Sequence, residues 1–169
     1  IYGISQYGLS KQINVSNYEA EEFLNAYFAK FPEIKIYMEK TIKFCRKSGY
    51  VSNIFGRRSH FTSINDKNYN VRNFQERAAI NAPIQGSASE IMRLAMIRLD
   101  KRLNEKKNKT KMLLQIHDEL IFEAPKDEAK RISKIIIEEM SSVANSDQHS
   151  FSIPLTVDLN IGDNWGELH

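Results

Sequence analysis

The feature that most constrains the fold is a pair of apolar runs separated by only two residues. The runs, 111–116 and 119–124, each have the length of a β-strand, and His117 and Asp118 lie between them. Two strands joined by so short a loop form an antiparallel β-hairpin. One or both residues of such a turn take a positive φ angle, which Gly and Asn adopt more readily than His or Asp. The sequence therefore predicts a hairpin whose turn carries polar side chains at a conformational cost.

The negative charges of the acidic residues at this turn must be neutralised or exposed to water. Asp118 and its neighbour Glu119 lie within one of the most apolar parts of the chain, and burying an unpaired carboxylate costs roughly several kcal/mol. The hairpin is expected to lift both carboxylates to the tip of an otherwise buried sheet, where a divalent cation could neutralise them. A solvent-exposed turn of a purely structural hairpin is the alternative that this pattern leaves open.

Helical patterns dominate the rest of the chain. Capping signals and the spacing of apolar residues predict helices over 16–31, 32–48, 71–103 and 125–140. Pro83 is expected to kink or divide the third of these helices, because proline removes a backbone donor and crowds the preceding turn. Short strands are expected over 50–55 and 155–161. Helices and strands that are interspersed without a regular βαβ order predict an α+β fold.

Composition limits the possible classes of protein. The 169 residues are 41% hydrophobic and 27% charged, which suits one compact domain or parts of two. A net charge of +3 permits a polyanionic partner without requiring one. The single cysteine, Cys45, excludes an internal disulfide and is expected in the core, as are the aromatic residues Tyr18 and Phe23. No apolar run has the length of a membrane span, and because the chain begins at Ile1, we expect a missing upstream part.

Two further groups of polar side chains are candidates for ligand contact. Arg77, Asn81 and Gln85 recur at intervals of four residues, which places three long hydrogen-bonding side chains along one stripe of a helix. A solvated polar face is the alternative for this stripe. Arg57 and Arg58 fall in an expected basic turn, where they could bind backbone phosphate or simply lie exposed to water.

Five motifs that occur in order resemble those of the family A DNA polymerases. They lie at residues 2–9, 55–58, 76–86, 115–120 and 162–165. The resemblance covers essentially the whole chain. It implies the C-terminal part of a DNA-directed DNA polymerase, which adds dNTPs to a primer 3′ end by a two-metal mechanism. The implied architecture is a helical fingers portion plus an antiparallel palm sheet with a catalytic β-hairpin, packed against helices.

The resemblance implies a role for each residue of the turn. Asp118 is similar to the family's second catalytic aspartate and Glu119 to its neighbouring acid, so both are expected to bind two Mg²⁺ ions together with a carboxylate from an upstream palm strand. His117 resembles a residue placed by the primer terminus. Tyr2 and Gly3 resemble the nucleotide and template pocket at the end of the fingers motif.

The other candidates are expected at the nucleic acid. In the family, the positions of Arg77, Asn81 and Gln85 contact the minor groove of the primer–template and the catalytic centre. Arg57 and Arg58 are expected to contact the DNA backbone. Residues 87–90, SASE, depart from the more usual TAAD of the family, so the resemblance assigns no precise role to that segment.

The resemblance also implies an organisation. Residues 1–70 are expected to form the distal part of a fingers subdomain and residues 71–169 the C-terminal part of a palm subdomain. The expected partners are primer–template DNA and dNTP, with no membrane, and the full-length enzyme is expected to be a monomer of the bacterial cytoplasm, associated with the nucleoid, or of an organelle. The fragment alone is expected to be inactive, because the first catalytic aspartate should lie upstream of Ile1.

Two other classes of function compete with a polymerase. A metal-dependent nuclease could use residues 117–119, with Asp158 and Asp163 as further carboxylates. A non-catalytic nucleic-acid-binding module would use only the arginine pair at 57–58 and the stripe that begins at Arg77.

Overall fold

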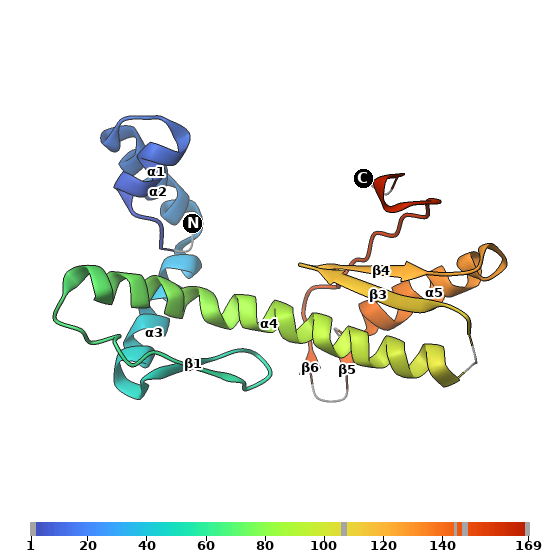
Figure 1. Cartoon of the computed structure of the whole chain (residues 1–169). Helices are drawn as coiled ribbons and strands as arrows, with labels where there is room; N and C mark the ends of the chain where they lie inside the picture. The colour runs from blue at the N-terminus through green and yellow to red at the C-terminus, as the bar shows by residue number, and fades with distance from the viewer. Residues whose placement is uncertain (1–2, 106–107, 144, 147–148, 168–169) are drawn as a thin grey trace. The chain divides into compact units, whose positions relative to one another are not determined.

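The computed structural model of the chain describes residues 3–105, 108–143, 145–146 and 149–167 (Figure 1). The helices and strands are α1 (Gln6–Ile13), α2 (Asn17–Lys30), α3 (Pro32–Ser48), β1 (Tyr50–Ser52), β2 (Arg58–His60), α4 (Tyr69–Glu105), β3 (Lys111–Ile116), β4 (Glu119–Glu123), α5 (Lys126–Ser142), β5 (Asn145–Ser146), β6 (His149–Ser150) and the 3₁₀ helix η1 (Trp165–Glu167). The strands pair as β1–β2, β3–β4 and β5–β6, each pair antiparallel. The predicted α+β class is confirmed. The chain forms two compact units, Ile1–Ser87 and Ala88–His169.

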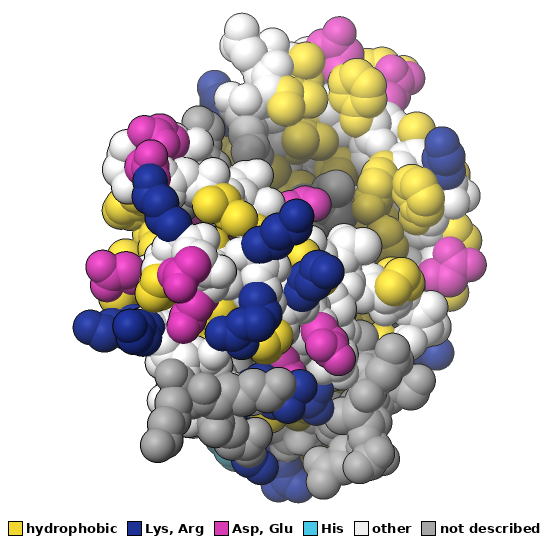
Figure 2. Space-filling model, turned by 90° about the vertical axis from the view of Figure 1, so that its right-hand side faces the viewer, with side chains coloured by type: hydrophobic (Ala, Val, Ile, Leu, Met, Phe, Trp, Pro, Cys, Tyr) yellow, Lys and Arg dark blue, Asp and Glu magenta, His cyan; other side chains and the backbone are white. Residues whose placement is uncertain are grey.

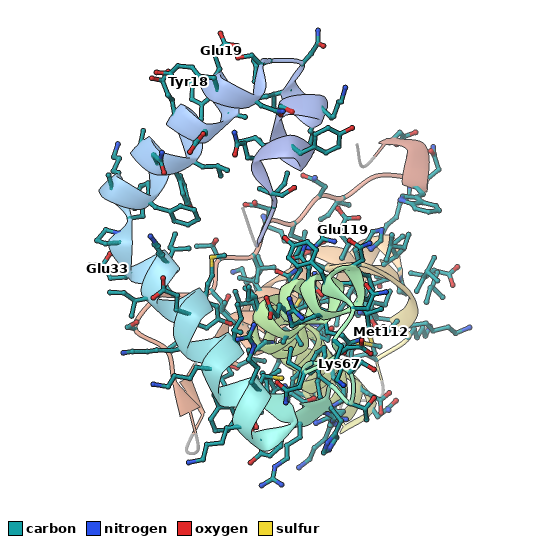
Figure 3. All side chains as sticks on the ribbon, turned by 90° about the vertical axis from the view of Figure 1, so that its left-hand side faces the viewer. Tyr18, Glu19, Glu33, Lys67, Met112 and Glu119 are labelled. Carbon is teal, nitrogen blue, oxygen red and sulfur yellow. The ribbon has the colours of Figure 1, made fainter. Side chains whose placement is uncertain are left out.

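The helix boundaries in the first unit follow from local capping. Ser16 and Glu19 form the predicted capping box at the start of α2, and Figure 3 shows Glu19 beside Tyr18 at this end of the helix. Pro32 occupies the first turn of α3, where its missing N–H costs nothing. Helix α1 was not predicted, although Ser5 caps it by accepting a hydrogen bond from the Gly8 N–H at 3.1 Å.

The core of the first unit is small. It contains Cys45, Val51, Ile64 and Ala79, each at most 3% exposed. The prediction for Cys45 is confirmed, and its burial raises the pKa of the thiol above the ordinary value. The expectation that the aromatic residues of α2 form core is wrong at two positions, because Tyr18 is 68% exposed and Phe23 is 57% exposed. On the face drawn in Figure 2, which is the right-hand side of Figure 1, hydrophobic side chains likewise reach the surface among charged ones.

Strand β1 is shorter than predicted. It ends at Ser52, and Arg58 begins β2 instead of lying within the turn. The register pairs Tyr50 with His60 and Ser52 with Arg58. Residues 53–57 therefore connect the two strands, and we call the segment 53–58, which includes the first residue of β2, the arginine turn.

Helix α4 runs without a break through Pro83, so the expected division does not occur. Side-chain donors bind two carbonyl groups near the proline. The Tyr37 hydroxyl donates to the Ile80 carbonyl at 2.9 Å, and the Ser87 hydroxyl donates to the Pro83 carbonyl at 2.5 Å. A proline inside a helix removes the backbone hydrogen bond to the carbonyl four residues earlier, here that of Ala79. The two side-chain contacts are made to other carbonyls near the proline, those of Ile80 and Pro83.

The second unit packs the β3–β4 hairpin against two helices. Leu99 and Leu103 of α4 form a buried cluster with three residues of α5: Ile132, Ile135 and Ile136. Partly buried side chains of the hairpin, of α5 and of the C-terminal segment pack on this cluster: Leu120, Phe122, Met140 and Leu159. Burial of such side chains is the main stabilising contribution to a small domain. Among the described residues, none of the helices combines the length and apolar character of a membrane span.

The predicted strand over 155–161 is not formed. The segment alternates between half-buried and exposed residues as a strand does, but it pairs with no strand in the described part of the chain. A strand is defined by its ladder of hydrogen bonds, so an alternating sequence without a partner remains irregular.

Candidate functional site

The turn of the β3–β4 hairpin presents three polar side chains. Ile116 pairs with Glu119, so His117 and Asp118 alone form the turn, as predicted. His117 takes a φ of 50°, which confirms the expected positive angle, and Gln115 Nε2 donates a hydrogen bond to the His117 carbonyl at 3.1 Å. The side chains of His117, Asp118 and Glu119 are all exposed.

The hairpin is less buried than the sequence predicts. Leu120 and Phe122 pack on the core, and because side chains alternate along a strand, Glu119 points to the opposite face. Leu113 and Leu114 of β3 are 56% and 48% exposed, so the expectation of an otherwise buried sheet is wrong. The register shifts between Met112 and Leu114, a β-bulge that leaves Leu113 unpaired.

The two turn carboxylates are suited to a hard cation. Neither Asp118 nor Glu119 forms a hydrogen bond through its side chain or an ion pair with any described residue. Exposed, unpaired carboxylate oxygens are the ligands that Mg²⁺ prefers, and a Mg²⁺ site commonly takes only one or two of them from the protein. The donor set therefore fits a magnesium site, with the remaining ligands to come from elsewhere.

No complete metal site is present in the described ranges. No group of three or more His, Cys, Asp or Glu side chains lies close enough together there to hold an ion. Asp158 is exposed, and Asp163 lies 2.8 Å from Lys126 in an ion pair of which both members are largely exposed. These two aspartates do not complete a carboxylate cluster around the turn.

The stripe on α4 lines an open pocket within the first unit. Arg77, Asn81 and Gln85 all contribute to this pocket of about 740 Å³, so the prediction that they share one face is confirmed. The other lining residues are Ile4, Ser59, Phe61, Phe74, Ala78 and Ala82. The lining therefore combines three long polar side chains with apolar and aromatic surface. Ile4 could not have been assigned to it by helical periodicity, because it lies more than 70 residues away in the chain.

Gly3 approaches the same helix closely. Its φ is +81°, and a Cβ at this position would lie 2.9 Å from Cγ of Arg77. Only glycine combines this backbone angle with so close a contact. Tyr2, which precedes Gly3 in the same motif, lies outside the described residues. On helix α4, the Oδ1 atom of Asn81 is buried and accepts no hydrogen bond from the described part of the chain.

The arginine turn presents its basic residues at the surface. Arg57 and Arg58 are exposed, and the guanidinium of Arg58 lies over the ring of Tyr50, 4.4 Å from its centroid. Such a cation–π interaction contributes about 0.5–1 kcal/mol at an exposed site. The stacked guanidinium keeps hydrogen-bond donors at its edge for a second partner.

Two buried polar residues beside the turn were not predicted as functional. Asn53 is 8% exposed and Ser87 is 9% exposed. Asn53 N–H donates to the Arg57 carbonyl at 3.0 Å, and the side chains of Asn53 and Ser87 both connect the turn to α4. The available signal was an asparagine three residues before Gly56, a combination typical of turns.

Comparisons with known proteins place the chain in a family. The sequence profile of DNA polymerase family A matches residues 1–167. The chain is 42% identical over 167 residues to DNA polymerase I of Caldicellulosiruptor bescii, which covers 99% of this chain and 19% of that protein. It is 44% identical over 167 residues to DNA polymerase I of Streptococcus pneumoniae, with coverage of 99% and 18%. The chain thus spans about a fifth of the length of these relatives.

A solved structure agrees with the sequence relatives. The POL domain of Pol1 from M. smegmatis, in complex with DNA primer-template and dNTP, superposes with a TM-score of 0.84 at 36% sequence identity. The match covers 91% of this chain and 26% of that one. The profile match over nearly every residue, together with this likeness in fold, shows that the chain belongs to DNA polymerase family A.

Proposed function

We propose that the chain is part of a DNA-directed DNA polymerase, which adds dNTPs to the 3′ end of a primer in replication or repair. One observation carries the proposal: a chain of family A presents two exposed carboxylates, Asp118 and Glu119, at the turn of a short hairpin, and neither pairs with a described residue. We assign residues 1–70 to the distal fingers and 71–169 to the C-terminal palm of that enzyme.

Asp118 and Glu119 are the proposed metal ligands and catalytic residues. Family A polymerases are metal-dependent, generally with Mg²⁺, and a bound pair of such ions supplies positive charge to the phosphoryl group in transfer. The two carboxylates hold one side of that site, and a further carboxylate from the rest of the polymerase holds the other. His117, held at the turn with a positive φ, is proposed to lie beside the primer terminus.

The pocket in the first unit is proposed to receive primer–template DNA. Arg77, Asn81 and Gln85 offer hydrogen-bond donors to the minor groove, where every correct base pair presents acceptors. Arg57 and Arg58 are proposed to bind phosphates of the backbone, which supply most of the affinity of a protein for DNA.

The proposed partners are primer–template DNA and dNTP. A relative in fold has been solved in complex with both, which supports this proposal for the present chain. Gly3, together with Tyr2, is proposed to border the nucleotide and template pocket. We propose a monomeric enzyme that acts on the nucleoid DNA of a bacterium, as the curated relatives are bacterial.

Asp118→Ala in the complete polymerase tests the assignment. We expect primer extension to fall roughly a thousandfold or more, because a metal ligand contributes several kcal/mol to the transition state. DNA binding should change little, since phosphate contacts elsewhere supply the affinity. Glu123→Ala is the matched control: Glu123 is an exposed carboxylate at the far end of β4, and its removal should leave extension unchanged. Near-normal extension by Asp118→Ala would refute the metal assignment.

The same variant separates a polymerase from a nuclease. The nuclease alternative lost support because Asp163 pairs with Lys126 and no third carboxylate joins the turn within the described residues. A nuclease would degrade the primer without dNTP in an Asp118-dependent reaction. A polymerase would lengthen the primer only when dNTP is supplied.

A further inference from the structure

Asn53 holds the arginine turn through three hydrogen bonds from one buried side chain. Its Oδ1 accepts from the backbone N–H of Phe55 at 3.0 Å and from that of Arg57 at 2.9 Å, while its Nδ2 donates to the Gly86 carbonyl at 3.1 Å. Every hydrogen-bonding role of the amide except one donor is therefore used. The same side chain shapes the turn and ties it to helix α4.

Ser87 provides a second tie one residue further along α4. Its Oγ accepts a hydrogen bond from the Ile54 N–H at 3.2 Å and donates to the Pro83 carbonyl at 2.5 Å. The two ties thus reach α4 at consecutive residues, 86 and 87. These residues directly follow Gln85, so the backbone path between the turn and this pocket residue is short and hydrogen-bonded.

We propose that Asn53 is a positioning residue for DNA binding, which fixes Arg57 and Arg58 relative to Gln85. The inference rests on the proposed function and extends it to a residue whose side chain is buried. A loose turn would have to be ordered when DNA binds, and the lost chain entropy would reduce the affinity. A turn that is already tied to α4 presents its guanidinium groups at a fixed distance from the groove contacts.

A buried asparagine that only stabilises the fold predicts a different result. Its removal would lower stability, and any effect on DNA binding would not depend on the arginines. The proposed role predicts that the effect passes through Arg57 and Arg58. A double-mutant cycle distinguishes the two, because coupled residues give non-additive changes.

The experiment measures the dissociation constant for a primer–template duplex over a range of salt concentrations, with the complete polymerase. Asn53→Ala should weaken binding about five- to tenfold, because hydrogen bonds that order the turn are lost. The slope of log affinity against log salt should become shallower by about one, as expected when a phosphate contact is lost. Ser87→Ala should act in the same direction with a smaller effect, and alanine keeps α4 helical.

The decisive comparison is made in the Arg57→Ala/Arg58→Ala background. There the Asn53→Ala change should cause no further loss of affinity. Asn65→Ala is the matched control, because Asn65 Nδ2 also donates to a backbone carbonyl in this unit, that of Arg46 at 2.9 Å, but lies outside the turn. It should leave both the affinity and the salt slope unchanged.

Several outcomes would overturn the inference. Wild-type affinity and salt slope in Asn53→Ala would do so, as would an undiminished loss of affinity in the arginine-free background. If Asn53→Ala does not fold, Ser87→Ala makes the same test. Unchanged affinity and salt slope in that variant would refute the inference that the hydrogen bonds between the turn and α4 position the arginines. If Arg57→Ala/Arg58→Ala binds DNA with wild-type affinity, the proposed function of the turn itself is overturned. If that double variant binds weakly but Asn53→Ala binds normally, only this inference is overturned.

Discussion

Gly3 lies against helix α4 without room for a side chain. Gly3→Ala should lower stability by about 1–2 kcal/mol, because alanine is strained at a φ of +81°. It should also displace Arg77, whose Cγ would lie 2.9 Å from the new Cβ. We therefore expect primer extension by the complete polymerase to slow on the order of tenfold to a hundredfold. Single-turnover insertion and thermal unfolding measure the two effects.

Gly49→Ala separates backbone strain from this contact. Gly49 has a φ of +77°, but a Cβ there would meet nothing within 4 Å. Both variants should lose stability through backbone strain, Gly3→Ala somewhat more because of its contact with Arg77, while only Gly3→Ala should slow insertion. Equal rates in both variants would show that the contact with Arg77 does not matter for catalysis.

Single positions differ in how far the sequence predicts their environment. The positive φ of His117 was expected, because a two-residue turn demands it. The exposure of Tyr18 and Phe23 was not expected, because helical periodicity shows which residues share a face but not whether another element covers that face. The burial of Asn53 depends on contacts with Gly86, 33 residues away, which no local pattern contains.

The stability that the capping box gives to the N-terminus of α2 should depend on pH. Ser16 donates to the Glu19 carboxylate from its hydroxyl at 2.7 Å and from its backbone N–H at 2.9 Å, and these bonds lower the pKa of Glu19. A lowered pKa in the folded state means that the cap stabilises the helix above the ordinary pKa of Glu, and that this contribution is lost as pH falls through the lowered value.

NMR titration of the Glu19 carboxyl group checks this prediction. The pKa should lie below that of an ordinary glutamate and should return toward it in Ser16→Ala, which removes the hydroxyl donor. Identical titration curves for wild type and Ser16→Ala would show that the capping box does not form in solution.

The hairpin depends on the cluster shared by α4 and α5. Leu99 is fully buried there, so Leu99→Ala should destabilise the chain by about 2–5 kcal/mol through lost burial and the cavity left behind. Ile97 of the same helix is 52% exposed, and Ile97→Ala should cost about 0.5 kcal/mol or less. Urea unfolding of both variants measures the difference, and similar losses would mean that this cluster is not the core.

Elements were predictable where their signals are local. The hairpin, the capped start of α2 and the helix after Pro125 follow from turn length, capping residues and apolar spacing. The continuity of α4 through Pro83 was not predictable, because the local sequence contains the proline but not the tertiary contacts of the helix, such as that of Tyr37 with the Ile80 carbonyl. The extended segment at 155–161 shows the same limit, since a strand needs a partner that its own sequence cannot supply.

The balance of charge over the whole chain gives little affinity for DNA. It has 24 Lys and Arg against 21 Asp and Glu, so its net attraction to phosphate is weak, and the proposed DNA binding must depend on the placement of individual donors. The candidate site was only partly predictable from the sequence. Spacing along α4 identified Arg77, Asn81 and Gln85, whereas the contributions of Ile4 and Ser59 to the same pocket required the tertiary structure.

The proposed groove-reading role of the pocket gives a prediction about base pairing. Minor-groove acceptors occupy similar places in all correct pairs but are displaced in a mismatch. If Gln85 and Arg77 donate to these acceptors, their bonds align the primer end only when pairing is correct. Gln85→Ala and Arg77→Ala should each slow insertion on matched ends, on the order of tenfold to a hundredfold, because a misplaced primer end reacts slowly.

Single-nucleotide insertion on primers that lack one minor-groove acceptor tests this prediction. Removal of the acceptor should slow the wild-type enzyme, while a variant without the donor has no bond left to lose and should be slowed much less. Gln75→Ala is the matched control, because Gln75 is a glutamine of the same helix that does not line the pocket, and it should respond as wild type does. If Gln85→Ala and Arg77→Ala also respond to acceptor removal as wild type does, then these side chains do not contact the groove, and the stripe on α4 is a solvated helix face.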